Sequence, residues 1–164
     1  MPDEASLTAG SFDGPSEFAD RLREAFGGAA SQGWPALWCC DAEFADWPLG
    51  ETAVIEALQA WASSARRLRL LMQDDRQLRA RHPRFVAWRQ RWDHIIECRL
   101  CAASDAADLP SGLWTPGWIV GRHDPAGSRG RSTDSQLAVA SLRHRLDDAF
   151  ARARPGFPAS ILGL

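Results

Sequence analysis

Three short apolar segments recur along the chain, and a segment with helical periodicity separates each from the next. These segments are 36–40, 66–73 and 94–100. The first is an uninterrupted apolar run, ALWCC, as in a strand covered on both faces. The second alternates Leu68, Leu70 and Met72, which is the period of a strand. Strands that alternate with helices predict an α/β layered fold.

The C-terminal half adds strands without an intervening helix. Residues 113–123 predict one or two short strands broken at Pro116, with no room for a crossover helix, so the sheet should be mixed. A polar loop is expected at 124–134. A long helix should begin near Ser132 and turn four apolar residues inward: Leu137, Leu142, Leu146 and Phe150.

The two ends of the chain differ from its middle. Residues 1–12 are polar and acidic, and we expect them to be disordered, with residues 13–164 forming a single α/β domain. The apolar tail, 155–164, should dock on this domain or on a second copy of the chain. The N-terminus does not resemble a secretory signal, and no apolar stretch is long enough to cross a membrane. We therefore expect a cytoplasmic protein without a membrane partner.

The basic residues exclude several chemistries. All 19 are arginine and none is lysine, so no Schiff base, P-loop lysine or catalytic ammonium can form. The net charge of -2 gives no overall attraction for nucleic acid. The four histidines stand alone, without a serine or cysteine in a recognised nucleophile motif.

An acidic stretch follows the first predicted strand and is the first candidate site. Asp41, Glu43 and Asp46 lie there, with Glu51 at the start of the next helix. Open α/β sheets place their sites at the carboxyl ends of strands, where carboxylates could hold Mg²⁺ or exchange protons. Alternatively, these side chains satisfy loop amides and favour the helix N-terminus.

Four cysteines raise the question of a zinc site. Cys98 and Cys101 match C-x-x-C, and Cys39 and Cys40 could complete a set of four thiolates. However, adjacent residues on a strand point to opposite faces, and this C-x-x-C closes a strand instead of opening a helix. We expect buried, reduced cysteines that act as small hydrophobic residues, with no metal and no cofactor.

Nine arginines lie between Arg66 and Arg91, interleaved with aromatic residues. Such a segment could bind single-stranded nucleic acid, with Arg84, Arg89 and Arg91 as the candidate contacts. The alternative is a solvated face of an amphipathic helix whose aromatic residues belong to the core.

The order of these segments resembles one half of the phospholipase D-like fold. The matching pieces are RRLRLLMQD (66–74), WIVGRHD (118–124) and LAVASLRHRLDDAFARA (137–153). More closely, residues from about 13 to 164 resemble DUF7931, a bacterial family of uncharacterised function found alone or attached to acetyltransferases. The pieces that carry this second resemblance are CDAEFADWPLGETAVIEALQAW, RRLRLLMQDDRQLRARHPRFVAWRQRW and FPASILGL.

The resemblance implies a domain that has lost its catalytic motif. Phospholipase D enzymes use H-x-K-x-x-x-x-D, whose His attacks phosphorus and whose Lys stabilises the transition state. A chain without lysine cannot form this motif, and the best arginine match, at His82 and Arg84, has Arg89 where Asp is needed. The region where the family places the motif reads GLWTPGW, 112–118.

These observations leave three possible functions. The first is a non-catalytic binding or accessory domain with a protein partner or a second copy, because phospholipase D-like halves usually pair. The second is a nucleic-acid binder that uses the Arg66–Arg91 segment. The third is an enzyme that uses the acidic loop Asp41–Glu51.

Overall fold

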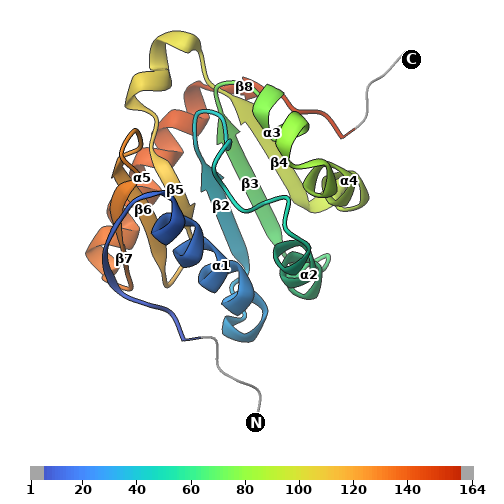
Figure 1. Cartoon of the computed structure of the whole chain (residues 1–164). Coiled ribbons are helices and arrows are strands. Elements are labelled where there is room, and N and C mark those ends of the chain that lie inside the picture. Colours follow the sequence, from blue (N-terminus) through green and yellow to red (C-terminus); the bar gives the residue numbers. More distant parts are fainter. Residues whose placement is uncertain (1–5, 160–164) are drawn as a thin grey trace.

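The computed structural model describes residues 6–159, which form an α/β fold around one eight-stranded sheet (Figure 1). The elements follow in chain order: β1 Gly10–Asp13, α1 Pro15–Gln32, β2 Ala36–Cys40, α2 Thr52–Trp61, β3 Arg67–Met72, α3 Arg76–Arg81, α4 Pro83–Arg91, η1 Asp93–Ile95, β4 Ile96–Leu100, η2 Ala103–Asp108, β5 Ser111–Trp114, β6 Ile119–Asp124, β7 Arg129–Thr133, α5 Gln136–Arg152 and β8 Arg154–Pro155.

The sheet is mixed, as the sequence predicts. Its strand order is β1-β7-β6-β5-β2-β3-β4-β8. The three strands that alternate with helices, β2, β3 and β4, pair in parallel. On one side β5, β6, β7 and β1 continue as an antiparallel group, and β8 closes the other edge against β4.

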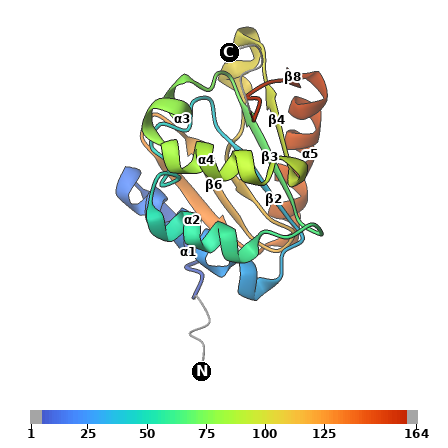
Figure 2. The same cartoon turned by 90° about the vertical axis from the view of Figure 1, so that its right-hand side faces the viewer.

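The two faces of the sheet are covered unequally. Helices α1 to α4 lie on one face, and α5 lies alone on the other (Figure 2). Alternate residues of β2 separate accordingly: Leu37 and Cys39 pack under the helical layer, and Trp38 and Cys40 pack toward α5. The fold is therefore a three-layer sandwich with one thick and one thin outer layer.

Local sequence explains the main helix boundaries. Pro15 stands in the first turn of α1, and Gly33 ends the helix in a left-handed conformation with φ 67°. Pro83 separates α3 from α4, since proline cannot continue the hydrogen-bond ladder of the preceding helix.

Three sequence expectations are wrong in detail. Residues 10–12, which were expected to be disordered, belong to β1, and Phe12 is only 3 % exposed. The predicted loop at 124–134 contains β7, whose inward residues are Gly130 and Ser132 and so give no apolar signal. Leu137 faces outward at 82 % exposure, and the inner face of α5 begins at Val139.

The apolar tail is described as far as Ala159. Phe157 is buried, and its ring lies under the guanidinium groups of Arg79 and Arg89. Ile161, Leu162 and Leu164 lie outside the described residues. Within residues 6–159, none of the helices has the length and apolar character that crossing a membrane requires.

The contact between β5 and β6 gives a stability test. Gly112 has φ +154°, and a Cβ there would overlap the carbonyl oxygen of Val120. Gly121 is its partner across the ladder, and a Cβ there meets no atom. We expect Gly112→Ala to lower the free energy of unfolding by about 1–3 kcal/mol or more. Gly121→Ala should change it by less than about 1 kcal/mol. Equal midpoints for both variants in urea denaturation would contradict this packing.

Candidate functional site

Asp41 follows β2 directly and organises the loop after it. Its Oδ2 accepts hydrogen bonds from the backbone N–H groups of Phe44 (2.8 Å) and Glu43 (3.3 Å). These bonds hold Phe44 in a left-handed conformation, φ 59°, with its ring buried in the core. The alternative given from sequence, that Asp41 satisfies loop amides, is therefore correct for its Oδ2. Its Oδ1 faces β5 and β6.

Arg122 meets that second oxygen from β6. Its Nη2 donates to Asp41 Oδ1 at 2.7 Å, and its Nη1 donates to Asp46 Oδ2 at 2.5 Å. Its Nε donates to the hydroxyl of Ser111 at 2.9 Å, and the guanidinium lies over the ring of Phe18 at 4.0 Å. The side chains of Arg122 and Asp41 are 3 % and 10 % exposed, so their ion pair is buried, whereas Asp46 joins it from the exposed side.

The network leaves no activated nucleophile. Ser111 donates its hydroxyl proton to Asp41 Oδ1 at 2.7 Å, and its oxygen is occupied by Arg122. A serine nucleophile needs a base that can take up its proton, and a carboxylate already bound to a guanidinium is a poor one. His82 is engaged elsewhere: its ring Nε2 is 2.8 Å from the carbonyl oxygen of Phe44, and burial lowers its pKa.

The structure brings Asp41, Glu43 and Asp46 to one hollow of about 390 Å³, together with Arg122. One guanidinium already binds Asp41 and Asp46, which opposes the metal-binding hypothesis. Within residues 6–159, no group of three or more His, Cys, Asp or Glu side chains is placed to hold a metal ion. Glu51 lies apart and pairs with Arg23, whose hydrogen bond holds the pKa of Glu51 below its usual range.

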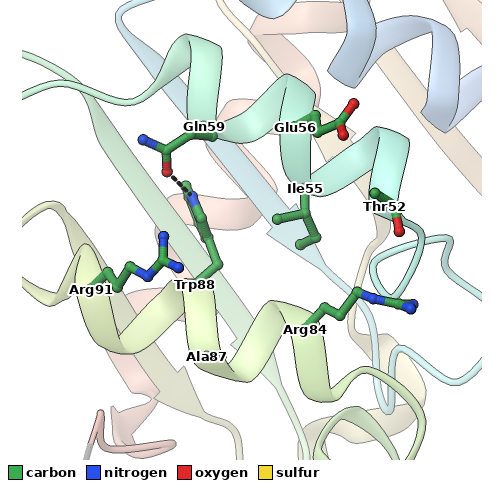
Figure 3. Close-up of a pocket in the computed structure, with 8 residues that line it drawn as sticks. All are labelled: Thr52, Ile55, Glu56, Gln59, Arg84, Ala87, Trp88 and Arg91. Atoms are coloured by element: carbon green, nitrogen blue, oxygen red, sulfur yellow. Dashed lines mark hydrogen bonds between the residues drawn. The ribbon is translucent and has the colours of Figure 1, made fainter.

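The structure separates the three arginines proposed for binding. Arg84 and Arg91 are exposed and lie toward opposite ends of a groove of about 420 Å³ between α2 and α4 (Figure 3). Ile55 and Trp88 lie between them, and the Trp88 indole N–H donates to Gln59 at 3.2 Å. Arg89 is 5 % exposed and holds the tail through the carbonyl oxygen of Phe157. It therefore does not contribute to this groove.

The four cysteines divide between the two faces, as the strand geometry predicts. Cys39 and Cys98 pack in the core under α1 to α4, and Cys40 and Cys101 pack under α5. Burial raises the pKa of Cys98 to about 11 and also raises the pKa of Cys39, so these thiols stay protonated near neutral pH.

Sequence reasoning missed Arg122 and Ser111. Arg122 lies two residues after Val120, so both face the same side of β6, and Val120 is fully buried. A charged residue at a core-facing position is the signal that could have identified it. Its carboxylate partner is 81 residues away, and sequence alone does not specify that pairing.

Solved structures provide the comparison. The chain matches TrmBL2, an archaeal chromatin protein whose structure shows a novel mode of DNA binding, with TM-score 0.65 and 13 % identity over 95 % of this chain. It spans 55 % of TrmBL2. It also matches NucT from Helicobacter pylori, with TM-score 0.59 and 9 % identity over 92 % of this chain and 99 % of NucT.

A third match decides the fold. Nuc from Salmonella typhimurium, a phospholipase D family member, aligns with TM-score 0.52 and 10 % identity over 92 % of this chain and all of Nuc. The chain adopts a phospholipase D-like fold. At these identities the likeness concerns the fold alone. No family model and no curated protein matches the sequence.

The buried network predicts a large effect of removing its cation. Arg122→Met should lower the free energy of unfolding by about 3–5 kcal/mol, because it leaves the charge of the buried Asp41 without a cation beside it. The control is Arg129→Met, which removes an exposed pair with Asp13 and should change stability by less than about 1 kcal/mol. Adding Asp41→Asn to Arg122→Met should restore part of the loss. Strictly additive effects in this double-mutant cycle would refute the coupling.

Proposed function

We propose that this chain is a non-catalytic binding or accessory domain built on a phospholipase D-like fold. The observation that carries the proposal is the network of Arg122, Asp41, Asp46 and Ser111 at the carboxyl end of β2. The resemblance places the family's motif at 112–118, and Ser111 directly precedes this region in β5. The polar groups beside this region already form hydrogen bonds with one another, so we infer that they are not free to act on a substrate.

The residue inventory supports the same proposal. The family's mechanism needs a histidine nucleophile and a lysine beside it, and the sequence contains no lysine. His123 follows Arg122 at an irregularity of the β6–β7 ladder; it is exposed and does not line the acidic hollow. His94 is exposed and stacks against Trp92, with ring centroids 5.6 Å apart. None of these side chains faces the acidic hollow.

The proposal includes a partner, either another protein or a second copy of the chain, because an accessory domain acts through what it binds. It also includes membership of DUF7931, which the quoted sequence pieces support. The enzyme alternative at the acidic loop is weakened because Arg122 neutralises two of its carboxylates, and only Glu43 lies on the hollow's rim outside that ion network.

A turnover assay tests the absence of catalysis. The purified chain should not hydrolyse a chromogenic phosphodiester or a single-stranded oligonucleotide above the rate of a buffer blank, with or without Mg²⁺. Hydrolysis that survives purification and disappears in His94→Ala or His123→Ala would refute the non-catalytic proposal. Hydrolysis that is unchanged in both variants and lost in Glu43→Gln would also refute the proposal, in favour of the enzyme alternative at the acidic loop. Hydrolysis unchanged in all three variants would indicate a contaminating nuclease.

Nucleic-acid binding is the second candidate. The specific observation that favours it is the pair of exposed arginines, Arg84 and Arg91, beside Trp88 on α4. The match to a DNA-binding chromatin protein adds support at the level of fold. The net charge of -2 means that any affinity must come from a local surface.

Salt dependence tests this candidate. Each phosphate neutralised on a single strand contributes about 0.7 to the slope of log affinity against log salt, so Arg84→Gln with Arg91→Gln should reduce that slope by ~1.4. Arg129→Gln with Arg131→Gln removes two exposed charges on β7 and should leave the slope unchanged. Binding that is independent of salt, or equally weakened by both pairs, would exclude the α4 surface.

A further inference from the structure

The thin side of the sheet contains a hollow that the proposed function does not use. It measures about 320 Å³ and lies at the amino ends of β2 and β3, between the sheet and α5. The acidic network lies at the opposite, carboxyl end of β2. The hollow is lined by three arginines, one glutamate and two tryptophans: Arg67, Arg69, Arg143, Glu97, Trp38 and Trp114.

Aromatic rings hold two of these guanidinium groups in place. Arg143, from α5, lies over Trp114 at 4.8 Å and over Trp38 at 5.3 Å. Arg69, from β3, also lies over Trp38, at 4.9 Å from the centre of its ring, and over Phe150, at 5.2 Å. Stacking fixes the plane of a guanidinium and leaves its edge N–H groups free to donate. The two side chains remain 40 % and 41 % exposed.

Much of the donor capacity of these arginines is unused within residues 6–159. The hydrogen bonds of Arg143 use its Nε alone, toward Asp147 at 3.1 and 3.3 Å. Arg69 has an ion pair with Glu97 at 3.7 Å, which is too long for a hydrogen bond. Arg67 donates through Nη1 to the carbonyl oxygens of Ser64 and Arg66. The remaining terminal N–H groups are available to an acceptor from outside.

The charge of the lining selects the ligand. Three guanidinium groups of the lining face the carboxylate of Glu97. Asp147, which accepts from Arg143, and Arg99, which pairs with Glu97, adjoin the lining and cancel each other, so the formal excess is two positive charges. A phosphate monoester carries about two negative charges, and a polynucleotide offers one on each backbone phosphate; the oxygens of both match the fork of a guanidinium. The volume exceeds what a single phosphate fills, so the ligand can carry a further group.

We propose that this hollow is a binding site for the phosphate of a phosphorylated ligand, held by Arg67, Arg69 and Arg143. The source of the phosphate is either a free nucleotide-like molecule or the backbone of a polynucleotide. The hollow shares no residue with the network at the other end of β2. It also uses the strand part of the arginine-rich segment, Arg67 and Arg69, instead of its helical part.

Calorimetric titration of the intact chain in phosphate-free buffer tests the site with three probes: pyrophosphate, adenosine monophosphate and a short oligothymidylate. Pyrophosphate should bind, and Arg69→Gln with Arg143→Gln should weaken binding by at least about tenfold, since charge-assisted hydrogen bonds are lost. The matched control, Arg84→Gln with Arg91→Gln, removes the same charge from the α2–α4 groove and should leave pyrophosphate binding within about twofold.

Arg69 and Arg143 also pack on Trp38, so their replacement could weaken binding by disturbing the fold. A second variant separates this effect from the loss of charge. Ala36→Glu removes no arginine or tryptophan side chain and adds a negative charge to the lining, so it should weaken pyrophosphate binding at least about tenfold through repulsion and competition for the guanidinium groups. Its circular dichroism spectrum and melting temperature check that it folds. Binding of adenosine monophosphate as well indicates a free nucleotide-like ligand, and binding of the oligothymidylate indicates a polynucleotide. Three results would overturn the proposal: no pyrophosphate binding, binding unaffected by Ala36→Glu, or binding lost only in the control pair.

Discussion

Arg122 points from β6 toward the core face of the sheet, where water cannot solvate its charge, and it therefore needs carboxylate partners. Asp41 and Asp46 supply them from the loop after β2, and Ser111 on β5 lies between them. The contact joins three consecutive strands of the sheet order, β6, β5 and β2. Asp41 meets this cation through Oδ1, and its Oδ2 binds the loop amides that hold the left-handed backbone of Phe44, so one carboxylate connects the cation to the shape of the acidic loop.

The same interaction constrains function. Carboxylates at the end of a parallel strand are common in active sites, but here two of them already pair with one buried arginine, and Asp41 is itself buried. A group that is to bind a metal or move a proton must be able to leave its resting partner, and breaking a buried pair costs several kcal/mol. A ligand is therefore more easily bound where exposed arginines line the surface. Two such surfaces are the groove between α2 and α4 and the hollow between the sheet and α5.

Much of the fold was predictable because its signals are local. The run ALWCC, the alternation of Leu68, Leu70 and Met72, and the break at Pro83 each define one element without help from distant residues. β7 was missed because its inward residues are Gly130 and Ser132, which pack closely but carry no apolar signal. The pairing of Asp41 with Arg122 could not be predicted from the residues next to either one, because it depends on the order of the strands in the sheet.

The proposed non-catalytic function requires that the ion network at the carboxyl end of β2 stays closed to a phosphodiester. Proton NMR of the Arg122 side chain tests it most directly, because its Nε–H is buried and donates to Ser111 at 2.9 Å. The account predicts a resolved Nε–H signal that exchanges slowly with water and does not shift when dimethyl phosphate is added. A signal that exchanges rapidly, or that shifts to saturation with the phosphodiester, would contradict it.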